Sequence, residues 1–256
     1  MRVSRRCKIL LVGALSCSVL AGCPLTRHAP TPPPAAAPPA VAPHAGQPYD
    51  IVADASLLTV QVYRAGPLAS AGHNHVIASH ALRGSIYVPA DISRSSFEVT
   101  IPVATLTVDE TPLRAALASP DFPPDVPEGA KEGTRRNMLG AMLLDAEHSP
   151  EIVLRGTRVE RSAPAYGAAA TDADSVLVRI ESTVRGQVRT LAVPLRYRLT
   201  GGVLTVTGEF PLRQSDLGLK PFSAMLGALQ VQDEMRVSVR IVARTAAVNK
   251  DLSGTP

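Results

Sequence analysis

The stretch "VRTLAVPLRYRLT", residues 188–200, decides the fold class of this chain. Apolar side chains occupy every second position in its centre, at Leu191, Val193, Leu195, Tyr197 and Leu199. Successive side chains of a β-strand point to opposite faces of the sheet, so an apolar period of two predicts a strand with one buried face. A helix would need an apolar period of about 3.6 residues, which this stretch lacks.

The same alternation recurs on both sides of this strand. The other stretches that show it are "SLLTVQVYR" (56–64), "GSIYVPA" (84–90), "SSFEVTIPVATLTV" (95–108), "EIVLRGTRVE" (151–160), "DSVLVRIEST" (174–183), "VLTVTGEFPLR" (203–213) and "EMRVSVRIVAR" (234–244). Gly, Pro and Asp separate them, as in short turns, and no long helical pattern lies between them. We therefore predict an all-β fold of about eight antiparallel strands that close into a barrel. A two-sheet sandwich of immunoglobulin type is the alternative, although the chain has no Trp for the usual core pattern.

The middle of the chain interrupts the strand pattern and predicts one or two short helices. "TPLRAALASPDF" (111–122) starts a helix with Pro112 in its first turn. "TRRNMLGAMLLDAEHSPEI" (134–152) places Met138, Met142 and Leu143 on one helical face, and "PPDVPEGAKEGT" (123–134) is a loop. The methionines indicate either ordinary core packing or an adaptable apolar lid over a barrel mouth.

The N-terminal residues predict export. Basic residues precede the apolar run "ILLVGALSCSVLAG" (9–22), and "LAGC" (20–23) resembles the lipobox of bacterial lipoproteins. Cleavage before Cys23 would leave an N-terminal cysteine that carries lipid and tethers the protein to a membrane. A transmembrane anchor is the alternative, but the apolar run is shorter than the ~20 residues that cross a bilayer.

Four segments follow from this interpretation. They are a lipoprotein signal peptide (1–22), a tether rich in Pro and Ala (23–48), a β-barrel domain (49–246) and a C-terminal tail (247–256). We expect the mature protein in the periplasm, anchored to a membrane of the cell envelope through Cys23.

Charge and cysteine content exclude several classes of partner and chemistry. The formal net charge is +4, but residues 1–22 hold four cations and no acid, so the rest of the chain is balanced. We therefore expect no nucleic-acid partner. Two of the three cysteines leave with the signal peptide and the third takes the lipid, which excludes thiol catalysis and a cysteine-based metal site.

Three of the six histidines lie in "SAGHNHVIASH" (70–80). His73 and His75 are two residues apart, so on a strand both would face the same way, as a pair of metal ligands requires. A metal site needs a third ligand, and the nearest candidates are His80, His148 and Glu147. Two other interpretations remain: a polar group at the barrel mouth that contacts a ligand headgroup, or histidines with a structural role only.

The chain lacks the motifs of several common enzyme classes. It contains no HExxH zinc motif, no G-x-S-x-G elbow and no Gly-rich phosphate loop. We therefore expect a protein without catalytic residues, metal or cofactor.

Several pieces of sequence, in a fixed order, resemble a known family. They are Asp54 with Ser56, a strand with His75 leading to Gly84, "AEHSPEIVLRG" (146–156) and "FPLRQSDLGLKPFSAMLGALQVQDEMRVSVRIVA" (210–243). Together they resemble the YceI-like family of exported bacterial proteins over nearly all of residues 49–244. The chain departs from the family pattern in its His-, Ala- and Gly-rich second strand and in a longer, proline-rich tract at 111–134.

The resemblance implies an extended, eight-stranded, lipocalin-like barrel that binds a polyisoprenoid or similar long apolar lipid without metal or redox cofactor. The residues that it places along the ligand are Val60, Val62, His73, His75, Ile77, Met138, Met142, Ile152, Leu154, Phe222 and Met225. The composition agrees, because 45% hydrophobic but only 4% aromatic residues favour an aliphatic lining, which suits a flexible hydrocarbon. Two alternatives are a periplasmic metal-binding or metal-dependent protein that uses His73 and His75, and a structural envelope module whose barrel is filled by its own side chains.

Overall fold

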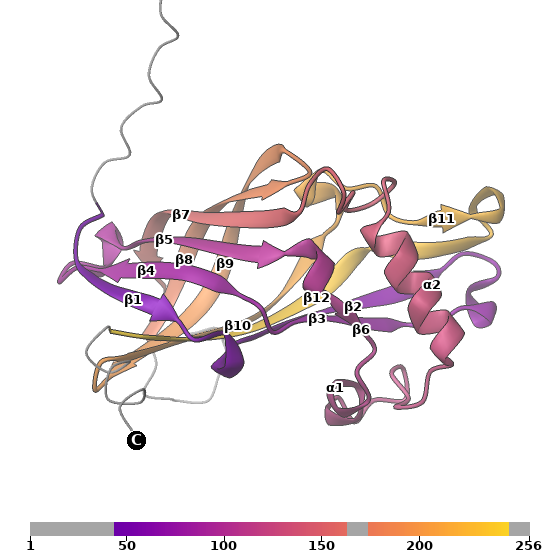
Figure 1. Cartoon of the computed structure of the whole chain (residues 1–256), viewed down its shortest axis with the longest axis horizontal. Coiled ribbons are helices and arrows are strands. Elements are labelled where there is room, and N and C mark those ends of the chain that lie inside the picture. The colour runs from indigo at the N-terminus through magenta and orange to yellow at the C-terminus, as the bar shows by residue number, and fades with distance from the viewer. Residues whose placement is uncertain (1–43, 163–173, 246–256) are drawn as a thin grey trace, which may run out of the picture. The chain divides into compact units, whose positions relative to one another are not determined.

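A closed antiparallel β-barrel with two helices at one end makes up the folded part of the chain (Figure 1). The computed structural model describes residues 44–162 and 174–245. The predicted signal peptide, Cys23, the tether up to residue 43 and the C-terminal tail lie outside the described residues. The strands are β1 (Gln47–Ile51), β2 (Leu57–Ala65), β3 (His75–Ser79), β4 (Arg83–Val88), β5 (Ser96–Pro102), β6 (Thr107–Val108), β7 (Glu151–Arg161), β8 (Asp174–Val184), β9 (Gln187–Thr200), β10 (Val203–Arg213), β11 (Ser223–Ala224) and β12 (Leu229–Arg244).

Eleven of these segments make up the eight strands of the barrel, because three of the eight are each divided into two segments: β1 and β2, β3 and β4, and β5 and β6. β1 and β2 follow one another along the same edge of β12, separated by the 3-10 turn η1 (Ala53–Ala55). β4 and β3 pair with them in the same way, and β5 and β6, separated by η4 (Val103–Thr105), pair with β4 and β3. The ring then runs through β7, β8, β9 and β10 back to β12. The predicted eight-stranded antiparallel barrel is confirmed, and the sandwich alternative is wrong.

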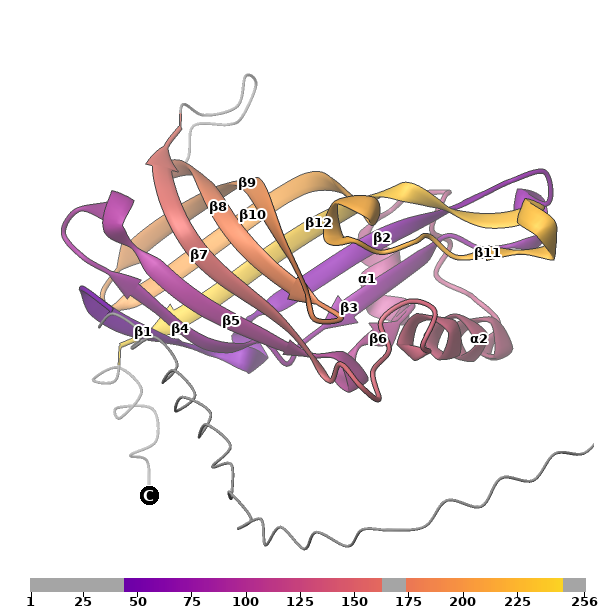
Figure 2. The ribbon, with the colours of Figure 1, turned by 90° about the horizontal axis from the view of Figure 1, so that it is seen from above.

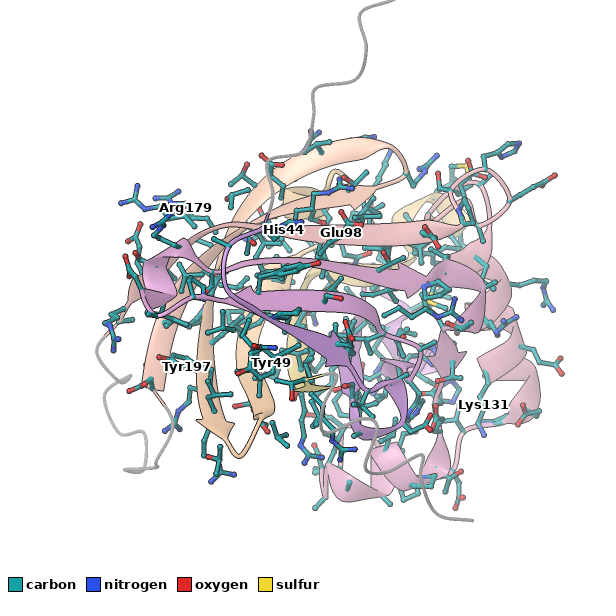
Figure 3. All side chains as sticks on the ribbon, turned by 60° about the vertical axis from the view of Figure 1, so that its left-hand side comes forward. His44, Tyr49, Glu98, Lys131, Arg179 and Tyr197 are labelled. Atoms are coloured by element: carbon teal, nitrogen blue, oxygen red, sulfur yellow. The ribbon has the colours of Figure 1, made fainter. Side chains whose placement is uncertain are left out.

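The alternation that predicted the strands sorts their side chains between interior and solvent. In β8 the buried residues are Val176, Val178, Ile180, Ser182 and Val184, every second one along the strand. Arg179 lies between them on the outside, where Figure 3 shows its side chain projecting from the barrel. The apolar face of β9 is less complete than predicted, because Leu199 sits beside the turn to β10 and is exposed.

Gly84 in β4 illustrates how tightly two of the strands approach. Its φ of +125° lies in a region that side chains rarely adopt, and an added Cβ would clash with the carbonyl oxygen of Glu98 on β5. Glycine at this position therefore allows β4 and β5 to pair in register, with Gly84 opposite Val99.

Helix α1 (Thr111–Ala116) agrees with the prediction, with Pro112 in its first turn. Helix α2 (Glu128–Leu139) does not, because it starts inside the predicted loop and ends before Met142. The physical reason is that Pro127 precedes its first turn and Gly140, with an extended backbone, ends it. The prediction that Met142 shares a helical face with Met138 is therefore wrong. No helix within the described ranges combines the length and apolar character needed to cross a membrane.

The two ends of the barrel differ. At one end β1 pairs with both β4 and β12, and Tyr49, Ile86, Leu204 and Ala243 form a buried cluster there. At the other end β6 ends the sheet and α2 packs against it, as Figure 2 shows. Short 3-10 turns complete the chain: η2 (Ala69–Ala71), η3 (Ile92–Arg94), η5 (Ser215–Leu217) and η6 (Met225–Gly227). Both ends therefore carry packed clusters, because Met138 and Leu106 are buried beside α2 as well.

Candidate functional site: an aliphatic cavity with a polar end

The barrel encloses a cavity of about 530 Å³. This volume falls within the range of roughly 300–1,000 Å³ that is typical of small-molecule sites. Its walls are the inward faces of the strands, including Leu58, Val60, Val62, Ile77, Val99, Ile101, Ile152, Leu154, Ile180, Leu191, Val193, Leu195, Val237, Val239 and Ile241. Aromatic rings are few, at Phe97, Phe210 and Phe222. The surface offered to a ligand is therefore mainly branched aliphatic carbon.

Most of the residues that the sequence placed along a ligand do line this cavity. They are Val60, Val62, His73, His75, Ile77, Met138, Ile152, Leu154 and Phe222. Met142 and Met225 do not line it, and 83% and 68% of their surfaces are exposed. Met142 lies in the turn after α2, and Met225 lies in η6 at the far end of the β11–β12 hairpin.

His73 and His75 both line the cavity, but they do not lie on one strand as the sequence predicted. β3 begins at His75, so His73 precedes the strand and the two are not consecutive inward positions of one strand. Their ring centres are 6.1 Å apart. His80 and His148 instead contact Glu110 and Asp145. Across residues 44–162 and 174–245, no group of three or more His, Cys, Asp or Glu side chains is arranged to hold a metal ion.

His75 belongs to a buried polar network that the sequence did not reveal. Its Nδ1 lies 2.5 Å from Oδ2 of Asp109, and Nη1 of Arg114 lies 2.5 Å from Oδ1 of the same carboxylate. The Asp109 side chain is fully buried and the Arg114 side chain is 1% exposed. The Val76 amide also donates to Asp109 Oδ1 at 2.8 Å. We call these residues, His75, Asp109 and Arg114, the polar network.

Arg114 holds the network in place from α1. Beyond Asp109, its guanidinium donates to the carbonyl oxygens of Asn74 and Pro123 at 2.8 and 2.7 Å. Phe122 packs beneath it, with its ring centre 5.5 Å from the guanidinium carbon. Burial raises the pKa of Asp109, but hydrogen bonds from His75, the Val76 amide and Arg114 outweigh burial and leave this pKa below its ordinary value of 3.8. Asp109 is therefore an ionised carboxylate at neutral pH.

The network fixes which nitrogen of His75 faces the cavity. Because the Asp109 carboxylate can only accept, Nδ1–H of His75 donates to it, which leaves Nε2 as the acceptor in the neutral ring. The hydroxyl of Thr134 on α2 lies 3.0 Å from that Nε2 and donates to it when the ring is neutral. The order of hydroxyl, imidazole and carboxylate resembles that of hydrolytic triads. However, Thr134 lies inside a regular helix rather than on a sharp turn after a strand. We therefore infer that these hydrogen bonds hold the His75 ring in position.

The polar groups of the cavity gather at its α2 end. Thr134 and Asn137 come from α2, His75 from the start of β3, and Gln214 from the residue after β10. Ser182, near the end of β8, also lines the cavity; its hydroxyl is buried and has no hydrogen-bond partner among the described residues. A buried hydroxyl without a partner is uncommon in folded proteins. The α2 end therefore offers hydrogen bonds to a ligand, whereas the β1 end offers only apolar contact.

No sequence signal identified Asp109, Arg114 or Thr134 as site residues. Asp109 is 34 positions from His75 and Thr134 is 59 positions from it, so only the fold brings them together. Both Arg114 and Thr134 come from the tract 111–134, to whose residues the sequence assigned no role in the site.

Comparison with known proteins places the barrel among related structures. The family model described as a YceI-like domain matches residues 49–243. The crystal structure of Burkholderia cenocepacia BcnA aligns with a TM-score of 0.52 and 17% identity, over 76% of this chain and 99% of that one. A polyisoprenoid binding domain from Saccharophagus degradans, implicated in plant cell wall breakdown, aligns with a TM-score of 0.47 and 12% identity, over 77% and 98%. The Campylobacter jejuni YCEI protein aligns with a TM-score of 0.41 and 9% identity, over 64% and 80%. No curated protein matches the chain.

Proposed function

Because the chain belongs to the YceI-like family, we propose that it is a non-catalytic protein that binds a polyisoprenoid or similar long apolar lipid inside its barrel. The observation that carries this proposal is the cavity of about 530 Å³ with an almost wholly aliphatic wall. Burial of apolar surface contributes roughly 25 cal/mol per Å² to binding, and a branched hydrocarbon chain offers only such surface.

The charges around the cavity favour a ligand without strong charge. Among the described residues that line it, Arg64 is the one cation and none is a carboxylate. The Arg64 guanidinium already donates to the Gly72 carbonyl oxygen at 2.8 Å. A multiply charged headgroup would leave several anionic oxygens unpaired inside this cavity, at a large desolvation cost. We therefore favour a neutral or weakly polar headgroup.

The uneven distribution of polar groups gives the ligand a direction. The headgroup would lie at the α2 end, where the Ser182 hydroxyl has no partner among the described residues and the Thr134 hydroxyl oxygen can still accept a hydrogen bond. The apolar tail would extend toward β1, between side chains such as Val206 and Ile241. This orientation satisfies polar groups at one end and buries hydrocarbon along the rest.

The place of action that we propose rests on the sequence alone. The apolar run of residues 9–22 followed by "LAGC" supports export and lipid attachment at Cys23. In this proposal the barrel works in the periplasm, tethered to a membrane of the cell envelope by residues 23–48.

Native mass spectrometry with lipid extraction tests the binding function. Residues 46–256 would be purified from the periplasm of a bacterial host and analysed for a co-purifying lipid. We expect a polyisoprenoid or similar lipid, and we expect its loss in Val60→Trp, because the indole ring would fill space that the ligand needs. Val188→Trp is the matched control, since Val188 lies on β9, is 55% exposed and does not line the cavity.

Two outcomes would favour the alternatives. A protein that stays empty even when lipid is offered would support the structural envelope module. Stoichiometric metal after purification without an affinity tag, lost in the double variant His73→Ala, His75→Ala, would support a metal-binding protein. Circular dichroism of each variant checks that the barrel is intact.

A further inference from the structure

Two loops at the α2 end of the molecule form an exposed apolar tip. We define this distal tip as residues 66–72, between β2 and β3, together with residues 224–228, between β11 and β12. Leu226 is fully exposed, Met225 is 68% exposed and Leu68 is 41% exposed. Figures 1 and 2 both show the β11 hairpin projecting at the end of the molecule opposite to β1. Large apolar side chains side by side on an exposed projection are unusual on a soluble surface.

The distal tip is an ordered structure rather than a frayed loop. The Leu68 amide donates to the Ala228 carbonyl oxygen at 2.8 Å, which joins the two loops. The Ala228 amide donates to the Met225 carbonyl oxygen at 3.1 Å and closes the turn of η6. Met225 and Leu226 have φ values of 51° and 55°, in the left-handed region that favours glycine. The chain therefore presents two bulky apolar side chains in a backbone conformation that does not favour them.

The charged side chains nearest to the distal tip along the chain include two cations. Residues 64–75 and 217–232 contain Arg64 and Lys220 and no Asp or Glu, and the first carboxylates beyond the second segment are Asp216 and Asp233. An apolar projection flanked by cations matches a bilayer, because its side chains enter the interface while the cations meet anionic headgroups. A protein partner with an apolar pocket would not require the absence of carboxylates over both segments.

The distal tip is continuous with the cavity. Gly72 in the first loop, Phe222 before β11 and Leu229 after η6 all line the cavity wall. A lipid that leaves a bilayer at the distal tip would therefore meet the cavity lining directly.

We propose that the distal tip inserts into the surface of a bilayer that contains anionic lipids, and that ligand enters the barrel from the membrane at this end. The surface is thus a membrane-docking site built from Leu68, Met225 and Leu226, with Arg64 and Lys220 beside it. The docking step stands on the exposed side chains and the charge, whereas the entry step rests on the lipid-binding function proposed above.

Vesicle co-sedimentation tests the docking step. A chain of residues 44–256 suits the test, because residues 44–245 contain every strand of the barrel and both helices. We expect it to sediment with vesicles of phosphatidylcholine mixed with phosphatidylglycerol. The double variant Met225→Asn, Leu226→Asn removes both apolar side chains, and asparagine tolerates the left-handed backbone at these positions. We expect it to lower the partition coefficient at least about tenfold, which corresponds to ~1.4 kcal/mol.

Matched variants separate the distal tip from general apolar surface. Leu199→Asn, in the β9–β10 hairpin, and Met142→Asn, after α2, each remove an exposed apolar side chain from another part of the surface and should leave sedimentation unchanged. Lys220→Gln should weaken binding to the mixed vesicles more than to pure phosphatidylcholine. Equal sedimentation of the tip variant and the wild type would overturn the proposal, as would equal losses in the two controls or no sedimentation of the wild type. A dimer in solution that the tip variant dissociates would also overturn it, because a second copy would then cover the tip.

A blocked cavity distinguishes failure of docking from failure of ligand binding. Val60→Trp should lose co-purified lipid but sediment with vesicles like the wild type. A wild type that carries lipid but does not sediment would contradict the docking proposal and leave the binding function intact. A wild type that sediments but never carries lipid would contradict the binding function and the entry step only.

Discussion

The cavity has two kinds of wall, and they depend on different features of the sequence. The strand wall consists of interchangeable aliphatic side chains such as Val60, Ile152 and Leu154, each held by its position in a sheet. The polar network of His75, Asp109 and Arg114 depends instead on individual atoms placed 2.5 to 2.8 Å apart. The strand wall should therefore tolerate substitution that preserves its shape, whereas the polar network should respond strongly to loss of a single partner.

Loss of Arg114 should have the largest effect on stability. Arg114→Met leaves the buried Asp109 carboxylate without its guanidinium partner, and we expect the free energy of unfolding to fall by about 3–5 kcal/mol. Urea denaturation followed by circular dichroism measures this loss. The double variant Asp109→Leu, Arg114→Met removes both charges and should be more stable than Arg114→Met alone. If the double variant is less stable than the single one, the charge pair is not the source of the effect.

The contribution of Asp109 should depend on pH in a defined direction. Its pKa in the folded protein is lowered, so its stabilising effect is complete above the ordinary pKa of 3.8 and is lost as pH falls through the lower folded value. Asp109→Asn should be less stable than the wild type near neutral pH. The difference between them should stay nearly constant well above pH 3.8 and shrink as the pH falls below 3.8, as unfolding curves at each pH would show. A difference that grows on acidification would contradict the assignment of Asp109 as the ionised partner.

Truncation of a side chain in the strand wall should lower the free energy of unfolding by less than loss of Arg114. Leu154 on β7 is partly buried and one side of it already faces the cavity, so Leu154→Ala should lower the free energy of unfolding by about 1–2 kcal/mol. This is below the ~2–5 kcal/mol typical of fully packed sites. Lipid binding should persist, because the cavity becomes larger without a new polar group. Thermal unfolding and lipid extraction on the same sample test both parts, and loss of bound lipid would show that the strand wall is more specific than we infer.

The sequence predicted the strand wall well, because the apolar period of two within each strand identifies its buried face. Leu191, Val193 and Leu195 line the cavity as the period of two required. Even the interrupted strands were visible, since β5 and β6 together span most of the stretch 95–108 that was predicted as a single strand. What the pattern could not give was the break at η4, where the strand passes from β4 to β3 as its partner.

The polar network could not be predicted, because its members come from separate elements. His75 starts β3, Asp109 lies between β6 and α1, and Arg114 lies in α1, so no short motif contains them. The helix prediction failed for a local reason: the apolar residues after Gly140 continued a helical pattern that the backbone does not follow. Met142 was therefore placed on the face of a helix that ends at Leu139.

The smallest effect should come from an ion pair on the outside of the barrel, which resembles the polar network only in its geometry. Arg155 Nε donates to Glu98 at 2.7 Å across β7 and β5, but the two side chains are 53% and 51% exposed. Water solvates both charges when the pair is broken, so Arg155→Ala should change the free energy of unfolding by no more than about 0.5 kcal/mol. Urea denaturation under the conditions used for Arg114→Met allows a direct comparison. A loss close to that of Arg114→Met would show that burial is not what makes the polar network sensitive, because the hydrogen-bond lengths at the two sites are similar and their exposure is not.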